Sequence, residues 1–305
     1  MPHFKSLSSG DSINIIAPAS AAPIERLNHG LEWLNQQGFE AHLPKDLLKP
    51  RLFFASPLET QVRHVKEAFK SDSLVLWCLR GGYGSARLIP YLEKLKKPAQ
   101  KKLLIGFSDI TALHLYLGQK WGWPTLHGRV LTQMDPKAKR RPDLKIYRQL
   151  LEGKIKSLTY SGLVPMNDAA KKSRTVSGPV TGGNLRLLEC SIGTGWELEA
   201  RGKILFLEDV GERGYSVHRM LVHLTQAGLL EGVRAIVLGD FIEGLESDGK
   251  DRTREALQAF ADETSIPVLR GMPCGHGEKN HPLPFHTKAT LKLGKRGTLK
   301  VATGF

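Results

Sequence analysis

A serine stands where a predicted strand turns into a predicted helix. The stretch KKLLIGFSDITALHLYL, residues 101–117, begins with aliphatic residues and, after Gly-Phe-Ser-Asp, continues with the spacing of an amphipathic helix. Gly106, two residues before Ser108, gives the room that a nucleophile elbow needs at such a turn. The usual elbow also has a glycine where Ile110 stands, and a serine before an aspartate at a helix start is ordinarily an N-cap. Ser108 is therefore a candidate nucleophile or a helix cap.

A nucleophilic hydroxyl needs a base, and the base needs an acceptor that fixes its tautomer. The motif PCGHG holds His276 in a Gly and Pro loop, which favours exact placement of one side chain, whereas His29 and His64 fall at positions expected on the surface. The apolar stretch ILFLED ends in Glu208 and Asp209, and buried carboxylates need partners. We expect one of these two acids to bind His276, and the sequence leaves open which.

A glycine-rich turn, RGGYG at residues 80–84, follows another apolar stretch. Consecutive glycines let backbone N–H groups approach a ligand closely, where they would stabilise an oxyanion or hold a phosphate. A dinucleotide fingerprint requires GxGxxG after the first strand, and that pattern is absent here. A plain tight turn is the remaining alternative.

Continuous apolar stretches alternate with helical patterns through the first half of the chain. This alternation predicts a parallel sheet covered by helices on both faces, with a ligand crevice where strands end and helices begin. The expected strands include 13–16, 74–79 and 103–107. The stretch 24–44 is expected to hold a helix with a glycine stop that completes a β-α-β opening, and further helices are expected within 59–71 and 85–95 and from 109 onward.

The second half is expected to be smaller, mixed and richer in β structure. Its strands are predicted within 178–184, 203–209, 235–241, 267–271, 288–294 and 297–304, and its helices within 216–230 and 253–264. We predict an N-terminal Rossmann-like α/β domain at 1–135, a linker or crossover at 136–177, where periodicity is weak, and a C-terminal β-rich domain at 178–305.

The composition is that of a folded globular chain of 305 residues, with 41% hydrophobic and 24% charged residues. The net charge of +14 raises nucleic acid as a partner. Its densest runs, 94–102 and 137–141, have no interleaved aromatic residues for base stacking and belong to no nucleic-acid-binding motif. We interpret them as solvated surface or as attraction for a small polyanionic substrate.

The N-terminus has no secretory signal pattern and no window resembles a membrane span, so we expect a cytoplasmic protein. The cysteines Cys78, Cys190 and Cys274 are odd in number, far apart and in no CxxC pair. They therefore suggest neither a disulfide framework nor a cysteine-built zinc site, and each is expected to be a buried thiol.

Five ordered motifs resemble one known family. After the N-terminal GDSINIIAPAS come RGGYGSARLIPYL, IGFSDITAL, GGNLRLL, LFLEDVGERGYSVHRML and GHGEKN. Together they look like the LD-carboxypeptidase family of serine peptidases, which also holds the microcin-immunity hydrolases. The resemblance spans nearly the whole chain.

The resemblance implies a Ser-Glu-His triad, which maps onto Ser108, Glu208 and His276. It also implies an oxyanion hole made by backbone N–H groups of Asp109 and of the turn at Gly81 and Gly82. Similar proteins have a Rossmann-like first domain and a β-rich second domain, with the triad assembled across their interface, commonly as homodimers. No cofactor and no metal is expected.

Two departures from the family pattern stand out. Similar proteins tend to carry glycine where His286 stands, and aspartate where Glu93 stands. Neither touches the triad, but both bear on the substrate pocket and so on which family activity is present.

By resemblance, the scissile bond joins diaminopimelate to a terminal D-alanine in a murein tetrapeptide, a step of peptidoglycan recycling. A carboxypeptidase must bind a free carboxylate, for which Arg80 and Arg186 are candidates, and Asn184 of GGN is a further substrate-binding candidate.

Three other functions stay open from the sequence. One is an immunity hydrolase that cleaves a peptidyl-nucleotide toxin with the same triad. Another is a metal-dependent amidohydrolase that uses Glu208, Asp209, His276 and His281, and the third is a basic nucleic-acid-binding protein.

Overall fold

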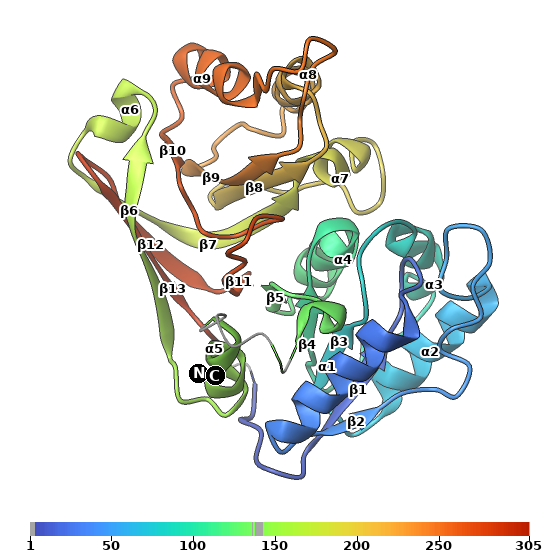
Figure 1. Cartoon of the computed structure of the whole chain (residues 1–305). Coiled ribbons are helices and arrows are strands. Elements are labelled where there is room, and N and C mark those ends of the chain that lie inside the picture. Colours follow the sequence, from blue (N-terminus) through green and yellow to red (C-terminus); the bar gives the residue numbers. More distant parts are fainter. Residues whose placement is uncertain (1–3, 136, 138–142, 305) are drawn as a thin grey trace. The chain divides into compact units, whose positions relative to one another are not determined.

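The computed structural model describes residues 4–135, 137 and 143–304. The chain divides into two compact units, Met1–Lys156 with Thr303–Phe305, and Ser157–Ala302, and each is described here by itself (Figure 1). The segment 136–177, expected to be a linker, contains helix α5 (Asp143–Leu151), strand β6 (Ser157–Pro165) and helix α6 (Asp168–Lys171) in its described part. The basic run at 137–141 lies, beyond its first residue, outside the described residues.

A parallel sheet forms the centre of the first unit, as the apolar stretches predicted. Its strands follow the order β2-β1-β3-β4-β5, and every neighbouring pair is parallel. All residues of β3 and β4 are buried, which explains their uninterrupted apolar sequence. The bounds are β1 (Ser12–Ile16), β2 (Glu40–His42), β3 (Val75–Cys78), β4 (Leu103–Gly106) and β5 (Thr125–His127).

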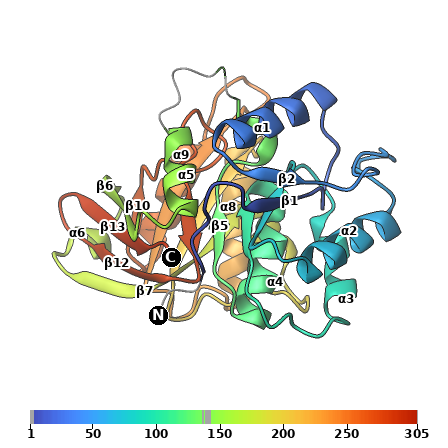
Figure 2. The same cartoon turned by 90° about the horizontal axis from the view of Figure 1, so that it is seen from below.

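Helices cover both faces of this sheet. In Figure 2, α1 and α5 lie on one side of it and α2, α3 and α4 on the other. Right-handed crossovers require this division, because the chain moves from β1 to β2 in one direction and from β2 through β3 to β5 in the other. The helices are α1 (Ile24–Gln36), α2 (Leu58–Lys70), α3 (Ile89–Leu92) and α4 (Thr111–Trp121), with 3₁₀ turns at Ser85–Leu88, Ser108–Ile110 and Leu131–Gln133.

Trp77 of β3 is the centre of the packing between the sheet, α1 and α5. The side chain is fully buried, and its indole N–H donates to the carbonyl of Arg129 at 2.9 Å. Its ring stacks on Tyr147 with 5.6 Å between centroids and meets the edge of Trp33 at 5.8 Å. One residue of the strand thus anchors both helices on this face of the sheet.

Two basic residues that the sequence placed on the surface are buried. His64 lies 2.8 Å from the carboxylate of Asp46, and the hydrogen bonds from His64 and Arg63 lower the pKa of Asp46 to about 2. Lys102, at the end of a run expected to be solvated, donates at 2.5 Å to the carbonyls of Ser71 and Ser73. Burial lowers the pKa of Lys102, and its two carbonyl contacts give this lysine a structural role before β4.

The second unit is a closed seven-stranded sheet in the order β10-β6-β13-β12-β7-β8-β9. Strands β7 to β10 pair in parallel, and the remaining pairs are antiparallel, so the predicted mixed, β-rich unit is confirmed. The strands besides β6 are β7 (Thr175–Asn184), β8 (Ile204–Val210), β9 (Ala235–Ile242), β10 (Val268–Arg270), β12 (Lys288–Lys292) and β13 (Gly297–Ala302), and the short β11 (Leu283–Phe285) lies outside this order.

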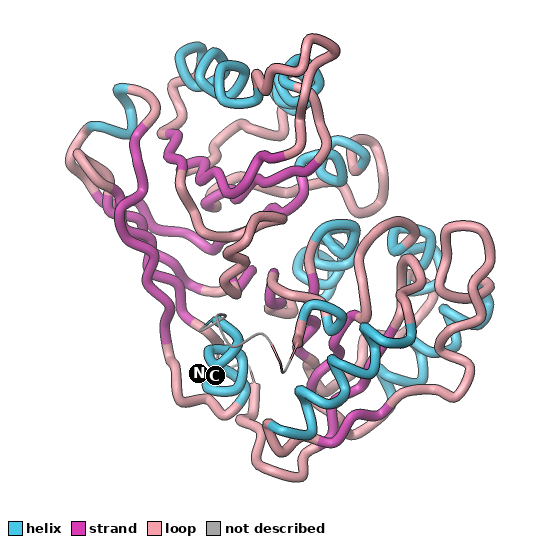
Figure 3. The backbone as a smooth tube through the Cα atoms, viewed as in Figure 1, coloured by secondary structure: helices cyan, strands magenta, loops and turns pink. Residues whose placement is uncertain are grey.

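The helices of the second unit gather over its parallel strands. Figure 3 shows α7, α8 and α9 beside β8 and β9, and the short α6 follows the end of β6. The bounds are α7 (Leu185–Cys190), α8 (Gly214–Gln226) and α9 (Thr253–Glu263). Because β7, β8 and β9 run in parallel, their carboxyl ends meet at one edge of the sheet, where Asn184, Glu208 and Asp240 stand.

The backbone and burial bear on two local features of the sequence. His286 has a φ of +61°, in the left-handed region that favours glycine. Cys78 and Cys274 are buried as expected, whereas the expectation for Cys190 was wrong, because this residue is exposed in the last turn of α7. Among the described residues, no helix is long and apolar enough to cross a lipid bilayer.

Replacing Trp77 with alanine is expected to lower the free energy of unfolding by about 3–5 kcal/mol, because it leaves a large cavity and removes the indole hydrogen bond. Ile24→Ala is the control, since Ile24 is 62% exposed on α1, and we expect it to change stability by less than about 0.5 kcal/mol. Urea titration followed by circular dichroism measures both. Equal, small losses would contradict the assigned role of Trp77.

Candidate active site

Ser108 lies on a strained strand-to-helix turn. Strand β4 ends at Gly106, and Ser108 has a φ of +64°, which is uncommon for a residue with a side chain. A Cβ atom at Gly106 would lie 3.1 Å from the Ile110 side chain and 3.2 Å from the Cβ of Cys78. Ser108 is the first residue of its 3₁₀ turn, and Phe107 occupies the N-cap position. This geometry favours the nucleophile elbow over the helix cap.

The glycine turn after β3 packs directly against this serine. A Cβ atom at Gly81 would lie 3.0 Å from the Cβ of Ser108, so only glycine allows the backbone to come so close. Gly82 has a φ of +97°, and its Cβ would lie 2.5 Å from the hydroxyl of Ser20. Within the part of the chain that the structure describes, the N–H groups of Gly82 and Asp109 donate to no other residue.

Asp109 joins the two turns. Its carboxylate accepts the N–H groups of Gly84 at 3.2 Å and Ser85 at 2.8 Å, and the Ser85 hydroxyl donates to its backbone carbonyl. Burial raises the pKa of Asp109, although these hydrogen bonds act in the opposite direction. The side chain of Asp109 thereby fixes the turn whose backbone lies against Ser108.

Glu208 and His276 form a close pair in the second unit. The carboxylate oxygen Oε2 of Glu208 lies 2.6 Å from Nδ1 of His276, and the Glu208 side chain is fully buried while that of His276 is 18% exposed. The structure therefore resolves the choice that the sequence left open: Glu208, and not Asp209, binds the histidine. Because Nδ1 faces Glu208, Nε2 is the candidate atom of this imidazole for proton transfer.

The charge balance around His276 favours its protonated form. Burial acts to lower the pKa of His276, but the hydrogen bond that its imidazole donates to Glu208 and the charges of Glu208, Asp209 and Asp240 outweigh it, so the pKa is raised above 6.5. This is the arrangement expected of a base that must hold a proton during a reaction.

Asp209 points to the other side of β8, as alternation along a strand requires. Its carboxylate accepts the side-chain amide of Asn184 at 2.9 Å and the N–H groups of Arg186 and Val210 at 2.9 and 2.8 Å. Burial and the neighbouring charge of Glu208 raise the pKa of Asp209 to about 6. Asp209 therefore joins the ends of β7 and β8.

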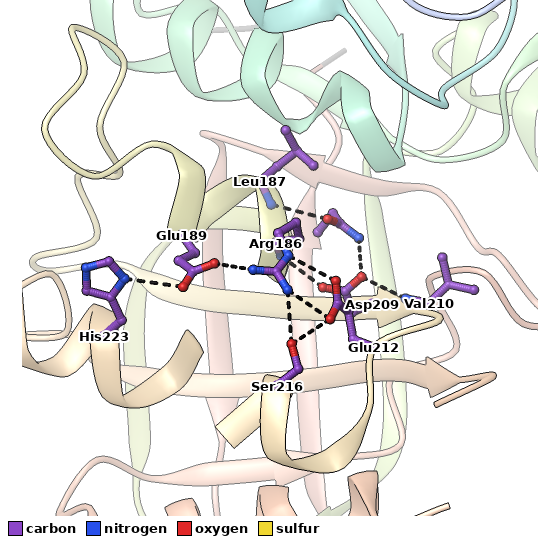
Figure 4. A network of polar contacts seen from close by, with 9 residues as sticks. Arg186, Leu187, Glu189, Asp209, Val210, Glu212, Ser216 and His223 are labelled. Atoms are coloured by element: carbon purple, nitrogen blue, oxygen red, sulfur yellow. Dashed lines mark hydrogen bonds and ion pairs between the residues drawn. The ribbon is translucent and has the colours of Figure 1, made fainter. Parts of the chain in front are cut away.

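Arg186, expected as a substrate ligand, belongs to a network within the second unit (Figure 4). Its guanidinium forms a two-point contact with Glu212 at 2.9 Å and further contacts with Glu189 and Ser216. The Asn184 side chain is likewise engaged, since it accepts the N–H of Leu187 while it donates to Asp209. These contacts support structural roles for both residues.

Arg80 is the exposed candidate for a substrate carboxylate. One guanidinium nitrogen donates to the carbonyl of Ala21 at 2.9 Å. The residue immediately precedes Gly81, so it belongs to the turn that packs against Ser108. Its role in binding stays a prediction.

Asp240 is a site residue that sequence reasoning missed. It lies near the end of β9, and its carboxylate accepts the N–H of Gly277, next to His276, at 3.0 Å. The sequence does hold a signal for this residue. The apolar stretch AIVLGDF places Asp240 near the end of a predicted strand, just as ILFLED places Glu208 and Asp209.

Glu208 and Asp209, two of the residues considered for a metal centre, face different partners. Glu208 holds His276, whereas Asp209 turns toward Asn184. No group of three or more His, Cys, Asp or Glu side chains in the described ranges is arranged to hold a metal ion. The geometry supports nucleophilic catalysis better than a metal centre.

Family models match both units. The model of the LD-carboxypeptidase N-terminal domain matches residues 13–128, and that of the C-terminal domain matches residues 177–291. A putative carboxypeptidase of Rickettsia conorii is 42% identical over 93% of this chain and 89% of its own. The murein tetrapeptide carboxypeptidase of Pseudomonas aeruginosa is 31% identical over 92% of both chains.

Solved structures agree with these matches. The muramoyltetrapeptide carboxypeptidase of Oxalobacter formigenes is 30% identical, covers 95% of this chain and 98% of its own, and has a TM-score of 0.82. Among the sequence relatives, the microcin C7 self-immunity protein of Escherichia coli is 28% identical over 95% of this chain and 93% of its own. The chain therefore belongs to the LD-carboxypeptidase family of serine peptidases, as its motifs predicted.

Proposed function

We propose that this enzyme releases the terminal D-alanine of a murein tetrapeptide through the triad Ser108, Glu208 and His276. The observation that carries the proposal is the 2.6 Å contact between the buried Glu208 carboxylate and His276. The left-handed backbone of Ser108 and its close approach to the glycine turn support the serine as nucleophile. The 31% identity to a murein tetrapeptide carboxypeptidase supports the substrate.

In the proposed reaction, Oγ of Ser108 attacks the carbonyl carbon of the scissile amide, and Nε2 of His276 takes the hydroxyl proton. Backbone N–H groups of Asp109 and of Gly81 and Gly82 receive the oxyanion. The amide C–N bond then breaks, and the imidazolium gives its proton to the departing D-alanine nitrogen.

The acyl-enzyme is hydrolysed by the same groups. His276 takes a proton from water as the water oxygen attacks the ester carbonyl, and it returns that proton to the Ser108 oxygen as the serine leaves. Glu208 holds the imidazole throughout and stabilises its positive charge. Arg80 is proposed to bind the free carboxylate of D-alanine. The expected cytoplasmic location and homodimeric assembly stay predictions.

Incubation with purified murein tetrapeptide tests the proposal. Mass spectrometry is expected to show the loss of a single terminal alanine. The matched pentapeptide, which ends in a D,D bond, serves as a control and is expected to remain intact.

An aminoacyl sulfamoyl nucleoside is the competing substrate to include, because the microcin immunity protein has been solved with glutamyl sulfamoyl guanosine. Cleavage of this compound with no action on the tetrapeptide would overturn the murein assignment and support the immunity type.

Ser108→Ala, Glu208→Ala and His276→Ala are each expected to lower kcat by roughly 10³-fold or more, and their combinations are expected to add little, since triad members act as a unit. Steady-state kinetics on the tetrapeptide measures the losses, with circular dichroism as a check on folding. Losses that multiply in the double variants would speak against a triad.

The pH dependence of kcat/KM follows from the raised pKa of His276. The base acts when it is neutral, so activity is expected to fall as the pH drops through a value above 6.5. Glu208→Gln removes the charge that favours imidazolium, so it should move this acidic limb to lower pH and also reduce activity on the plateau. An acidic limb unchanged by Glu208→Gln would show that another group controls it.

A further inference from the structure

The loop that carries His276 is held against strand β9 at two points. The backbone N–H of Asp240 donates to the carbonyl of Cys274 at 3.1 Å, and the Asp240 carboxylate accepts the N–H of Gly277 at 3.0 Å. These contacts lie two residues before His276 and one residue after it. Asp240 therefore spans the position of the base.

The two glycines beside His276 are required by the carboxylates behind the loop. A Cβ atom at Gly275, where φ is +131°, would lie 3.1 Å from the Cβ of Asp240 and 3.1 Å from Oε2 of Glu208. A Cβ atom at Gly277 would lie 2.7 Å from the Asp240 carboxylate. The loop thus packs its backbone onto both acids, and a shift of the Asp240 side chain would move the base.

Building on the proposed function, we propose that Asp240 is a positioning residue that fixes the loop of His276 through Gly277 and that its negative charge stabilises the imidazolium formed during catalysis. Three carboxylates act on the charge of His276, and they come from two strands. Glu208 and Asp209 act on His276 from β8 and Asp240 acts from β9, while the buried thiol of Cys274 lies within the field of Asp240 and Glu208.

Burial raises the pKa of Asp240, and the charge of Glu208 acts in the same direction. The hydrogen bond from Gly277 and the charge of His276 act against this rise. An ionised Asp240 is therefore favoured most when His276 is protonated, which couples the charges of the two residues.

Two variants separate the hydrogen bond from the charge. Asp240→Asn keeps an acceptor for Gly277 and removes the charge, whereas Asp240→Ala removes both. For Asp240→Asn we expect kcat at the plateau to stay within a few-fold of the value for the unmodified enzyme. The acidic limb of kcat/KM is expected to move to lower pH. For Asp240→Ala we expect kcat to fall by roughly tenfold or more with KM little changed, as for other residues that orient a catalytic group.

Histidine ring resonances followed by NMR over a pH titration of the full chain give a readout that needs no substrate. The His276 titration is expected to move to lower pH in both variants and to stay in place in Asp262→Asn, which removes an exposed carboxylate on α9. If neither variant moves the titration and Asp240→Ala keeps full kcat, the proposal is wrong. If the unmodified enzyme leaves the tetrapeptide intact, the murein assignment fails while the titration still tests Asp240.

Discussion

The hydrogen bond between Glu208 and His276 is the constraint on which the second unit's part of the site depends. A fully buried carboxylate is strongly unfavourable without a partner, and here the partner is the imidazole. Every element nearby serves this pair: β8 brings the acid to the edge of the sheet, β9 brings Asp240, and the loop between β10 and β11 presents the histidine. The surrounding carboxylates make the imidazole more basic than its burial alone would allow.

The first unit has a different constraint, because it must present the Ser108 hydroxyl at a turn where the backbone is crowded. The left-handed conformation of Ser108 is unfavourable by about 1–3 kcal/mol. It persists because several contacts hold the turns around it in place. Asp109 ties the serine turn to Gly84 and Ser85, and Gly81 leaves no space between the two backbones. Burial of β3 and β4 supplies the rigid base for both turns.

Strands with long apolar runs could be predicted from the sequence, because burial on both faces leaves an unmistakable pattern in β3, β4 and β8. The short strand β5 has three residues and carries too little pattern to be predicted. Strand β6 was hidden because its pairing with β13 shifts register beside Gly162, which interrupts the alternation of buried and exposed residues.

The site could be predicted where local motifs carry the chemistry, as at GFSD and GHG. The choice of Glu208 over Asp209 depends on which face of β8 each residue occupies, and the sequence did not fix that face. Asp240 depends on a contact between residues 37 positions apart, Asp240 and Gly277. Likewise, the partners of Arg186 come from α7, α8 and the segment before α8, so its engagement follows from tertiary structure alone.

The chain enters and leaves the second unit through neighbouring strands, since Ser157 of β6 pairs with Ala302 of β13. Thr303 then returns to the first unit, where its N–H donates to Lys156, and Gly304 accepts the N–H of Phe4 at 3.1 Å. The second unit is thus an insertion within the first. During synthesis, the first unit must wait for Thr303 and Gly304 before these contacts are complete, so the two units cannot mature strictly one after the other.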